Sequence, residues 1–458
     1  MCRELRKTTG WWPAMLLVLV ATTAWGGVSP EEAARLDADL TPMGAERGAN
    51  ADGTIPAWTG GITAPPPGYE PGARHLDPYA GDPILYTVTA ADLDVRGHLL
   101  SDGQKALLKA YPDTWWLNVY PTHRSASFPT WVYEAVRANA TRARLILDGK
   151  GSVADARVGP PFPIPHSGVE VIWNHNLRWR GARVERSEGI AAVTRLGRYR
   201  VVLLDQLLGL PYAAQRLDAF GKEYPNVLLA LKAKVVAPSR LAGNASLTIE
   251  PIDQTNDPRK TWIYDRDLHR VFRNPWVAYD FPAQYSDNLR TVDDLWLFNG
   301  PPDRFEWELL GKREMLIPYN AYRLDAGDVG PTAILRQHHI EPDLARYELH
   351  RVWVVQGTLK PGAKHVYSRR VFYVDEDSWQ IAVAESYDLQ GRLWRVDEAH
   401  AIDFYDVPAL CSALEVFHDL EQQRYLVNGL DNERHAWRFS EGSDPREFSP
   451  NALSYDVR

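Results

Sequence analysis

Four short β-type segments between Leu349 and Ala399 constrain the fold more than any other feature of this chain. β-branched and aromatic residues dominate each segment, and a Pro-Gly pair, an acidic run and a Gln-Gly pair separate them. Because parallel neighbours need a crossover of about a dozen residues or more, strands this closely spaced must pair antiparallel. The predicted strands are 351–359, 370–374, 379–385 and 392–396. We therefore expect an α+β protein built on a large, curved antiparallel sheet that forms a partial barrel.

The first part of the chain differs from the rest in its content of Pro and Gly. Between residues 27 and 165, Pro and Gly recur every few residues, as in ADGTIPAWTGGITAPPPGYEPG from Ala51, which is typical of extended, turn-rich chain. The predicted short helices are 30–40, 104–109 and 131–147. Because several Trp residues lie among them, we expect this Pro/Gly-rich segment to wrap onto a core formed by a sheet domain over 166–458.

Other patterns in the sheet domain predict two helices and a hairpin. Ser167 can cap a helix over 169–177, and Thr291 and Asp294 stand in capping-box positions for a helix over 292–298. The predicted hairpin joins 260–264 to 268–272.

The N-terminus has the layout of a cleavable secretory signal. Basic residues come first, an apolar stretch of about ten residues follows, and Ala24-Trp25-Gly26 forms a small-x-small cleavage site. A membrane-spanning helix needs roughly twenty apolar residues. We therefore expect residues 1–26 to be removed, and because Cys2 is lost with them, the mature chain is not a lipoprotein.

Charge and composition exclude several classes. Removal of residues 1–26 takes away three basic residues and one acidic residue, so the formal net charge changes from −8 to −10, which argues against nucleic-acid binding. The mature chain keeps one cysteine, Cys411, which excludes an internal disulfide and is expected to be a buried apolar residue. Fourteen of the 17 Trp and all 21 Tyr remain, and such side chains suit sheet faces and cavity walls.

Motifs for common catalytic sites are missing from the sequence, which contains no G-x-S-x-G, H-E-x-x-H, paired C-x-x-C, Walker loop or G-x-G-x-x-G. His338 and His339 with Glu341 are the best local candidates for a metal site, but adjacent strand residues point to opposite faces, so we expect none. His123 and His175 are isolated and are predicted to be hydrogen-bonded structural residues. No cofactor is expected.

Two charged groups need an interpretation. The acidic run Asp375-Glu376-Asp377 lies where a hairpin turn is expected, and we predict a solvated turn. Arg178, Arg180 and Arg183 follow the helix predicted over 169–177, and we expect them to pair with carboxylates; the alternative is that they hold an acidic head group.

Several long segments together resemble the bacterial exported family known as domain of unknown function 1329. The matching segments are GANADGTIPAWTGG from Gly48, LLKAYPDTWWLNVYPTHR from Leu107, FPIPHSGVEVIWNHNLRWRG from Phe162, FNGPPDRFEWELLGKREMLIPYN from Phe298, RYELHRVWVVQGTLKPG from Arg346 and RRVFYVDEDSW from Arg369. The resemblance implies a half-barrel similar to LolA and LolB, with helices covering its hydrophobic concave face. It also implies a periplasmic location in a Gram-negative bacterium, partnership with a resistance-nodulation-division (RND) exporter and an outer-membrane β-barrel, and no catalytic residues.

We therefore expect a periplasmic carrier that binds a lipid or another hydrophobic molecule in an apolar cavity. The predicted wall residues of that cavity are Trp353, Tyr373, Trp379 and Trp394. One alternative is a non-carrying adaptor whose residues 48–70 dock on the exporter or the barrel. Another is a hydrolase acting on lipid-like substrates, which would need His123, His175 or His339.

Overall fold

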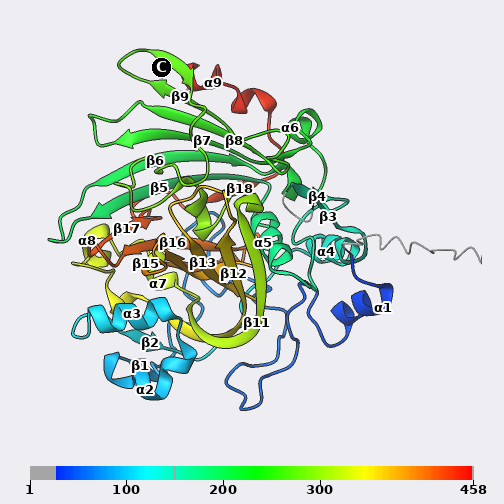
Figure 1. The fold of residues 1–458 in the computed structure, drawn as a ribbon, viewed down its shortest axis with the longest axis vertical. Helices are drawn as coiled ribbons and strands as arrows, with labels where there is room; N and C mark the ends of the chain where they lie inside the picture. Colours follow the sequence, from blue (N-terminus) through cyan, green and yellow to red (C-terminus); the bar gives the residue numbers. More distant parts are fainter. Residues whose placement is uncertain (1–26, 148–150, 456–458) are drawn as a thin grey trace, which may run out of the picture.

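A computed structural model describes residues 27–147 and 151–455 (Figure 1). The predicted signal peptide, residues 1–26, lies outside the described residues. Among the helices of the described part, none is both long and apolar enough to cross a bilayer.

One large sheet, 16-stranded in the described residues, dominates the molecule and confirms the predicted curved antiparallel architecture (Figure 1). In spatial order its main path is β1 (Tyr86–Val88), β2 (Leu117–Val119), β12 (Tyr347–Leu359), β13 (Arg369–Asp375), β14 (Ile381–Tyr387), β15 (Leu393–Asp403), β16 (Leu410–Asp419), β17 (Arg424–Asn428), β5 (Arg183–Val193), β6 (Val201–Gly209), β7 (Val227–Ala237), β8 (Ala245–Pro251), β9 (Lys260–Asp265) and β10 (Arg270–Arg273). β11 (Phe305–Pro318) pairs with β12, and β18 (Arg438–Ser440) pairs with β5. All these pairs are antiparallel except the single bridge between β2 and β12.

The predicted meander is β12 to β15, and consecutive strands pair as expected. Every residue of β14 and of β16 is buried, so both faces of the sheet are covered there. A strand buried on both faces has no polar side to present, which explains why apolar and polar residues alternate so imperfectly in this stretch.

On the inner side of the sheet lies α5 (Gly168–Leu177), which packs against β11 and β12. Nine of its ten residues are buried, as expected for a helix enclosed by a core. The helix follows Ser167 as predicted, and the Ser167 main-chain nitrogen donates to the Glu170 carboxylate at 3.0 Å. Beside α5, residues 274–299 face strands β5 to β8, and we call them the cover segment. It contains the 3₁₀ span Val292–Leu297, and the predicted capping box of Thr291 and Asp294 is present at its start. The prediction of one continuous helix over 292–298 is wrong, because Leu295 and Trp296 have non-helical backbone angles and break the span.

The N-terminal segment contributes both to the sheet and to its covering. Its helices are α1 (Pro30–Ala33), α2 (Leu93–Arg96), α3 (Asp102–Ala110) and α4 (Thr130–Arg142), and its residues also form β1, β2 and the small hairpin of β3 (Arg144–Ile146) with β4 (Ser152–Ala154). The prediction of one helix over 131–147 is wrong at its end, because Ala143 is extended and the next residues pair with β4. The helix predicted over 30–40 is α-helical only to Ala33 and continues as 3₁₀ helix to Asp37.

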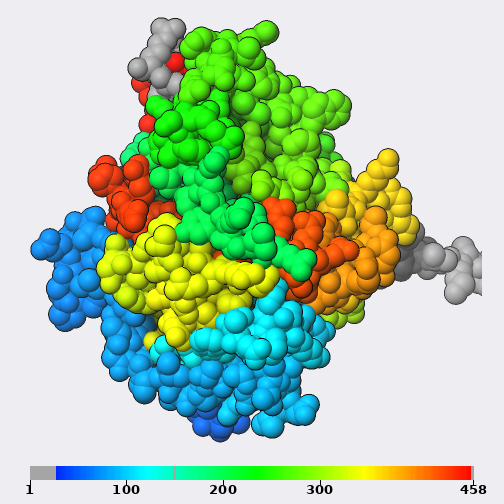
Figure 2. Space-filling view, turned by 90° about the vertical axis from the view of Figure 1, so that its left-hand side faces the viewer, coloured from blue at the N-terminus to red at the C-terminus, as the bar shows by residue number. Residues whose placement is uncertain are grey.

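The remaining short helices are α6 (Ala219–Glu223), α7 (Tyr322–Asp325), α8 (Pro331–Ile334) and α9 (Ala452–Tyr455). Figure 2 shows that the N-terminal residues, blue and cyan, form one end of the molecule and the green strands around β7 to β9 form the other. The site described next lies on the inner face toward the green end.

Candidate functional site

An apolar cavity lies between the inner face of β5 to β8 and the cover segment. Side chains two positions apart on β7, namely Leu229, Leu231 and Ala233, point into it, as the pleat of a strand requires. The strands add Ile190 and Leu204, and the cover segment adds Val277, Ala283, Tyr285, Val292 and Leu295. The enclosed volume is about 130 Å³.

A second space, of about 220 Å³, adjoins the first and shares part of its wall. The shared residues are Leu204, Ala233, Ser246, Gln284 and Tyr285. Together the two form what we call the inner cavity. Combined, they approach the few hundred Å³ that small-molecule sites usually occupy.

Polar groups on the wall of the inner cavity are largely bonded to one another. Arg259 donates to Glu250 at 2.8 Å, and Gln206 donates to Glu188 at 2.5 Å. Arg290 also lines the cavity, and its Nε and Nη1 have no acceptor in the described part of the chain. Apart from Arg290, the surface left for a ligand is mainly aliphatic. A wall of this kind favours an apolar ligand.

A larger cavity, of about 450 Å³, lies on the opposite face of the same strands. The alternate positions of β5 to β7 point there, and they carry Glu185, Asp205, Lys232 and Lys234. Size alone would favour this cavity, but a wall so rich in charges does not suit an apolar molecule. We therefore place the candidate binding site in the inner cavity.

The three arginines after α5 have different environments. Arg183 is paired with Glu185 at 2.6 Å and with Glu447 at 3.0 Å, as predicted. Arg178 and Arg180 are buried, and within the described residues neither forms an ion pair with a carboxylate. The prediction of pairing is therefore wrong for these two, because the backbone leaving α5 carries them into the interior instead of to the charged outer face.

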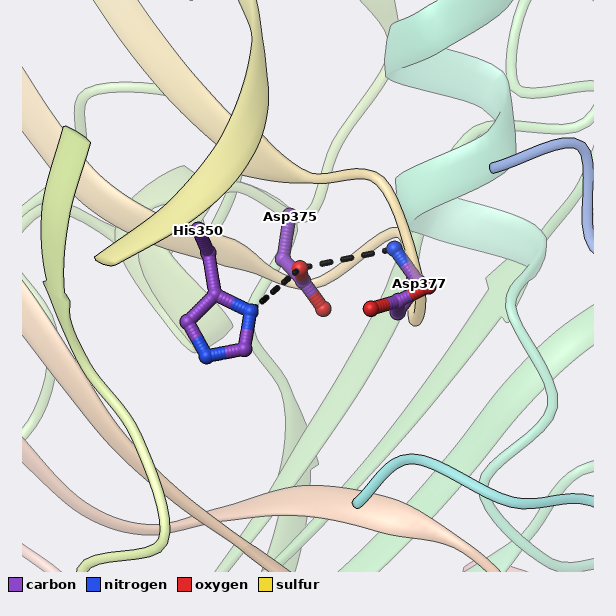
Figure 3. Close-up of side chains that lie close together, drawn as sticks. All are labelled: His350, Asp375 and Asp377. Carbon is purple, nitrogen blue, oxygen red and sulfur yellow. Dashed lines mark hydrogen bonds and ion pairs between the residues drawn. The ribbon is translucent and has the colours of Figure 1, made fainter. Parts of the chain in front are cut away.

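A second polar centre lies around the acidic run, where Asp375 is placed between the His350 ring and the main-chain nitrogen of Asp377 (Figure 3). His350, Asp375 and Asp377 offer potential metal-ligand atoms that lie within 4.8 Å of one another. The prediction of a solvated turn is wrong, because Asp375, Glu376 and Asp377 are all at most 4% exposed.

Each member of this cluster has a partner within the chain. Arg124 donates to Asp377 from Nε at 2.8 Å and from Nη2 at 2.6 Å. The Asp375 carboxylate accepts from the Ser378 main-chain nitrogen at 3.0 Å and from Tyr319 at 3.3 Å. His350 Nε2 contacts Glu348 at 3.2 Å. A metal ion would have to break these bonds, so we read the cluster as a structural network.

Charges within the network shift one another's pKa. Burial, together with the neighbouring Asp377, raises the pKa of Asp375 to about 6. Burial alone would also raise the pKa of Glu348, but the bonds from His350 and the charge of Arg346 lower it. Within one network, the pKa of Asp375 is therefore raised and the pKa of Glu348 is lowered.

The network joins segments that are far apart in sequence. Glu348 accepts from Asn320 at 2.9 Å, and Arg351 donates to the Gly48 carbonyl at 3.2 Å. Five of the segments on which the family resemblance rests each supply one residue of the network, namely Gly48, Arg124, Asn320, Arg351 and Asp377. The resemblance could therefore have pointed to these residues, although no local pattern indicated that the segments lie close together.

The predicted histidines are bound at separate places. His123 contacts Asp82 at 2.8 Å and stacks on Tyr79, while His339 is buried against Thr114 at 2.9 Å. His338 instead contacts the Gln423 carbonyl at 3.1 Å, so the adjacent histidines do not converge.

His175 lies fully buried on α5. Its Nδ1 accepts from the Ile381 main-chain nitrogen at 3.0 Å, which leaves Nε2 to donate to the Phe298 carbonyl at 3.0 Å. Burial lowers its pKa well below the ordinary value, so the ring is neutral and joins α5, β14 and the cover segment.

The four predicted cavity-wall aromatics lie on β12 to β15 and their turn. Trp353 stacks on Trp379 with ring centroids 6.3 Å apart, and Trp379 donates to the Met43 carbonyl at 2.9 Å. Tyr373 is buried near Glu385, and Trp394 donates to Asp419 at 2.9 Å. The inner cavity is instead lined by aliphatic residues of β5 to β8, which were not singled out from the sequence. A ligand-binding role for the four aromatics stays a prediction.

Comparison with known proteins identifies relatives. The model of a family described as "Protein of unknown function (DUF1329)" matches residues 87–454. A Pseudomonas aeruginosa protein described as "Uncharacterized protein PA3922" is 43% identical over 440 residues, which are 96% of each chain. A solved DUF1329 family protein from Desulfovibrio piger has a TM-score of 0.41 and 15% identity, covering 60% of this chain and 92% of that one. The LolA superfamily protein NE2245 from Nitrosomonas europaea has a TM-score of 0.38 and 10% identity, covering 63% of this chain and 100% of that one.

Proposed function

This chain belongs to the DUF1329 family, and from the cavity that its sheet encloses we propose that it is a periplasmic carrier of a lipid or another hydrophobic molecule. The observation that carries the proposal is the aliphatic wall of the inner cavity, formed by alternate residues of β5 to β8 and closed by the cover segment. Each methylene buried there contributes about 0.8 kcal/mol, so an acyl chain binds without specific polar contacts.

The periplasmic location rests on the sequence. Residues 1–26 have the order of a secretory signal, and the only other cysteine, Cys411, is buried and lies far from the N-terminus. From this location we propose that the chain acts as a shuttle between the two membranes and not as a fixed acceptor.

Binding accounts for the structure better than catalysis does. A hydrolase would need a base close to a nucleophile in an accessible cavity. His123, His175 and His339 are each engaged with different partners on different elements. None of these three is among the residues lining the inner cavity.

A carrier also needs a surface through which it meets its acceptor, which we propose to be the RND exporter or the outer-membrane barrel. At the end of the sheet, β10 and the chain beside it expose four large apolar side chains. These are Leu268, Phe272, Trp276 and Phe281, and we call them the edge patch. Exposed apolar side chains at and beside the last strand of a sheet favour contact with another protein.

A photo-crosslinker at Trp276 tests this contact in the host. Crosslinks to the exporter or the barrel, lost when Phe272 is changed to Ser, are expected. A crosslinker at the exposed Leu196, in the turn between β5 and β6, is the control. Equal crosslinking from both positions would contradict a specific contact.

The adaptor alternative places the contact on residues 48–70 instead. This stretch is bonded to the rest of the molecule, since Asn50 donates to Glu314 at 3.1 Å and Gly48 accepts from Arg351. Deleting it would disturb the buried network as well as any docking surface. Point changes at exposed residues of the stretch, such as Thr63 and Glu70, are therefore the cleaner test of that alternative.

The carrier function is tested with the apolar fluorescent probe N-phenyl-1-naphthylamine. The wild-type chain should bind the probe, and Ala233→Phe, which fills the space shared by both parts of the inner cavity, should weaken binding. Ala51→Phe places the same side chain on an exposed loop and should bind like the wild type. Unchanged binding by Ala233→Phe would show that the probe lies elsewhere.

A further inference from the structure

Two guanidinium groups are buried just after the C-terminal end of α5, and neither has a counter-ion among the described residues. Arg178 is 4% exposed and Arg180 is 5% exposed. Arg178 donates from Nη1 to the His175 carbonyl at 2.5 Å, but its Nε has no acceptor among the described residues. All three side-chain nitrogens of Arg180 lack an acceptor in the same part of the chain. Buried charges are normally paired, so this arrangement requires an explanation.

Among the described residues, no nearby acidic group is paired with either arginine. The charge of Glu415 acts on Arg178 from a distance, but its carboxylate accepts from Ser412 at 2.9 Å and forms no ion pair with Arg178 or Arg180. Glu250 is already bonded to Arg259 at 2.8 Å and to Gln254 at 3.0 Å. Burial raises the pKa of the Cys411 thiol to about 11, so this group is neutral at pH 7. Burial lowers the pKa of Arg178 to about 10, and burial together with the charge of Arg178 lowers the pKa of Arg180 well below its ordinary value. Guanidinium groups nevertheless stay protonated in proteins, so both charges remain at pH 7 and are costly without a partner.

Arg180 contacts an aromatic ring of the cover segment. The Arg180 Cζ lies 3.8 Å from the centre of the Trp296 ring. Trp296 has φ +56°, a left-handed conformation that is uncommon for a bulky residue. A cation–π contact compensates the charge only in part, because it leaves the N–H groups without acceptors.

The space beside the two guanidinium groups lies on the same face of β5 and β6 as the inner cavity: Val184 and Leu208 line that space, and Glu188 and Leu204, further along the same strands, line the cavity. Arg178, Arg180, Trp296 and Cys411 line a small space of about 20 Å³. Arg186 forms another part of its wall and donates at 2.8 Å to Gln206, which lines the inner cavity. On the cover side, Leu295 faces the inner cavity and the next residue, Trp296, faces the arginines.

We propose that Arg178 and Arg180 form a subsite for the anionic head, a carboxylate or phosphate, of an amphipathic molecule whose apolar chain occupies the inner cavity. This proposal rests on the carrier function and narrows its ligand class. Guanidinium groups bind carboxylates and phosphates through paired hydrogen bonds, and these bonds are strong where water is excluded. The head reaches the arginines when the Trp296 ring moves off Arg180, since the present space is smaller than such a group.

Binding of dodecyl phosphate and of dodecanol, measured by displacement of the apolar probe, tests the subsite. The wild-type chain should prefer dodecyl phosphate by about tenfold or more, because the two ligands share a tail and differ in the charged head. The variant Arg178→Met/Arg180→Met should lose this preference and still bind dodecanol. Arg183→Met, which removes the arginine paired with Glu185 and Glu447, should keep the preference.

A second measurement separates a binding role from a structural one. Removing an unpaired buried charge relieves a cost, so Arg180→Met alone should raise the midpoint of thermal unfolding of the ligand-free protein. A lower midpoint would overturn the proposal, because it would mean that Arg180 holds the fold together.

Three further binding results would each contradict the subsite or the carrier function. Equal affinity of the wild type for the two ligands would overturn the subsite and leave the carrier function standing. Binding of neither ligand would contradict the carrier function itself. Inorganic phosphate that binds as tightly as dodecyl phosphate would overturn the assignment to an amphipathic molecule, since the tail would then contribute nothing.

Discussion

Arg124 donates two hydrogen bonds, of 2.8 and 2.6 Å, to the Asp377 carboxylate, and the two residues are 253 positions apart in the sequence. Both side chains are at most 3% exposed, so the pair is shielded from water. It joins the N-terminal segment to the turn between β13 and β14. Through this pair and its neighbours, the Pro/Gly-rich segment becomes part of the core and does not behave as a loose extension.

Arg124→Met should destabilise the protein by about 3–5 kcal/mol, because it leaves the buried Asp377 carboxylate without its partner. Urea unfolding followed by circular dichroism measures the change. Arg35→Met is the control, since Arg35 and Asp39 form an exposed pair, and a change within about 1 kcal/mol is expected there. The double variant Arg124→Met/Asp377→Leu should recover part of the loss. A loss no greater than that of the control would contradict a structural role.

Glu398 makes stability depend on pH. Burial raises its pKa to about 7, although Gln104 and Tyr347 donate to it at 3.1 and 3.0 Å. Between about pH 4.5 and 7 the folded protein therefore keeps a proton that the unfolded chain releases, and this group makes the free energy of unfolding fall as pH rises.

Glu398→Gln removes that titration. The variant should lose less stability than the wild type between pH 5 and 7.5, and at pH 7.5 it should be the more stable by up to about 3 kcal/mol. Urea unfolding across this range provides the comparison, with the exposed Glu306→Gln as control. Parallel curves for wild type and Glu398→Gln would show that burial does not hold the proton on Glu398.

Trp379 should act mainly through packing. It is fully buried, stacks on Trp353 and donates to Met43, so Trp379→Ala should cost about 3–5 kcal/mol of unfolding free energy. Trp276→Ala, at an exposed position, should change stability by no more than about 0.5 kcal/mol. We expect folded Trp379→Ala to bind the apolar probe normally. Weaker binding by the folded variant would instead support its predicted place in a ligand site.

The sequence was most informative where neighbouring strands are also neighbours along the chain. The meander β12 to β15 and the hairpin of β9 with β10 follow from turn signals and β-type residues alone. Pairing of β17 with β5 joins residues more than 200 positions apart, and no local pattern specifies it. This pairing joins the strands that end at β17 to the consecutive strands β5 to β8, which form the inner cavity.

The same limit explains the errors at charged residues. An acidic run in a hairpin turn is normally solvated, and Asp375-Glu376-Asp377 is buried because Arg124, Lys312 and Arg351 approach from distant segments. The arginines after α5 resemble ordinary pairing residues in the sequence. Arg183 lies on the outer face and Arg180 lies in the interior, and this difference follows from the path of the backbone, which the sequence does not show.

Native mass spectrometry of the protein purified from its host's periplasm tests the central claim most directly. We predict that the wild-type chain carries the added mass of a bound amphipathic molecule, and that Ala233→Phe carries much less of it. A wild-type protein that shows only its own mass, and takes up no lipid when mixed with membrane extract, would contradict the carrier function.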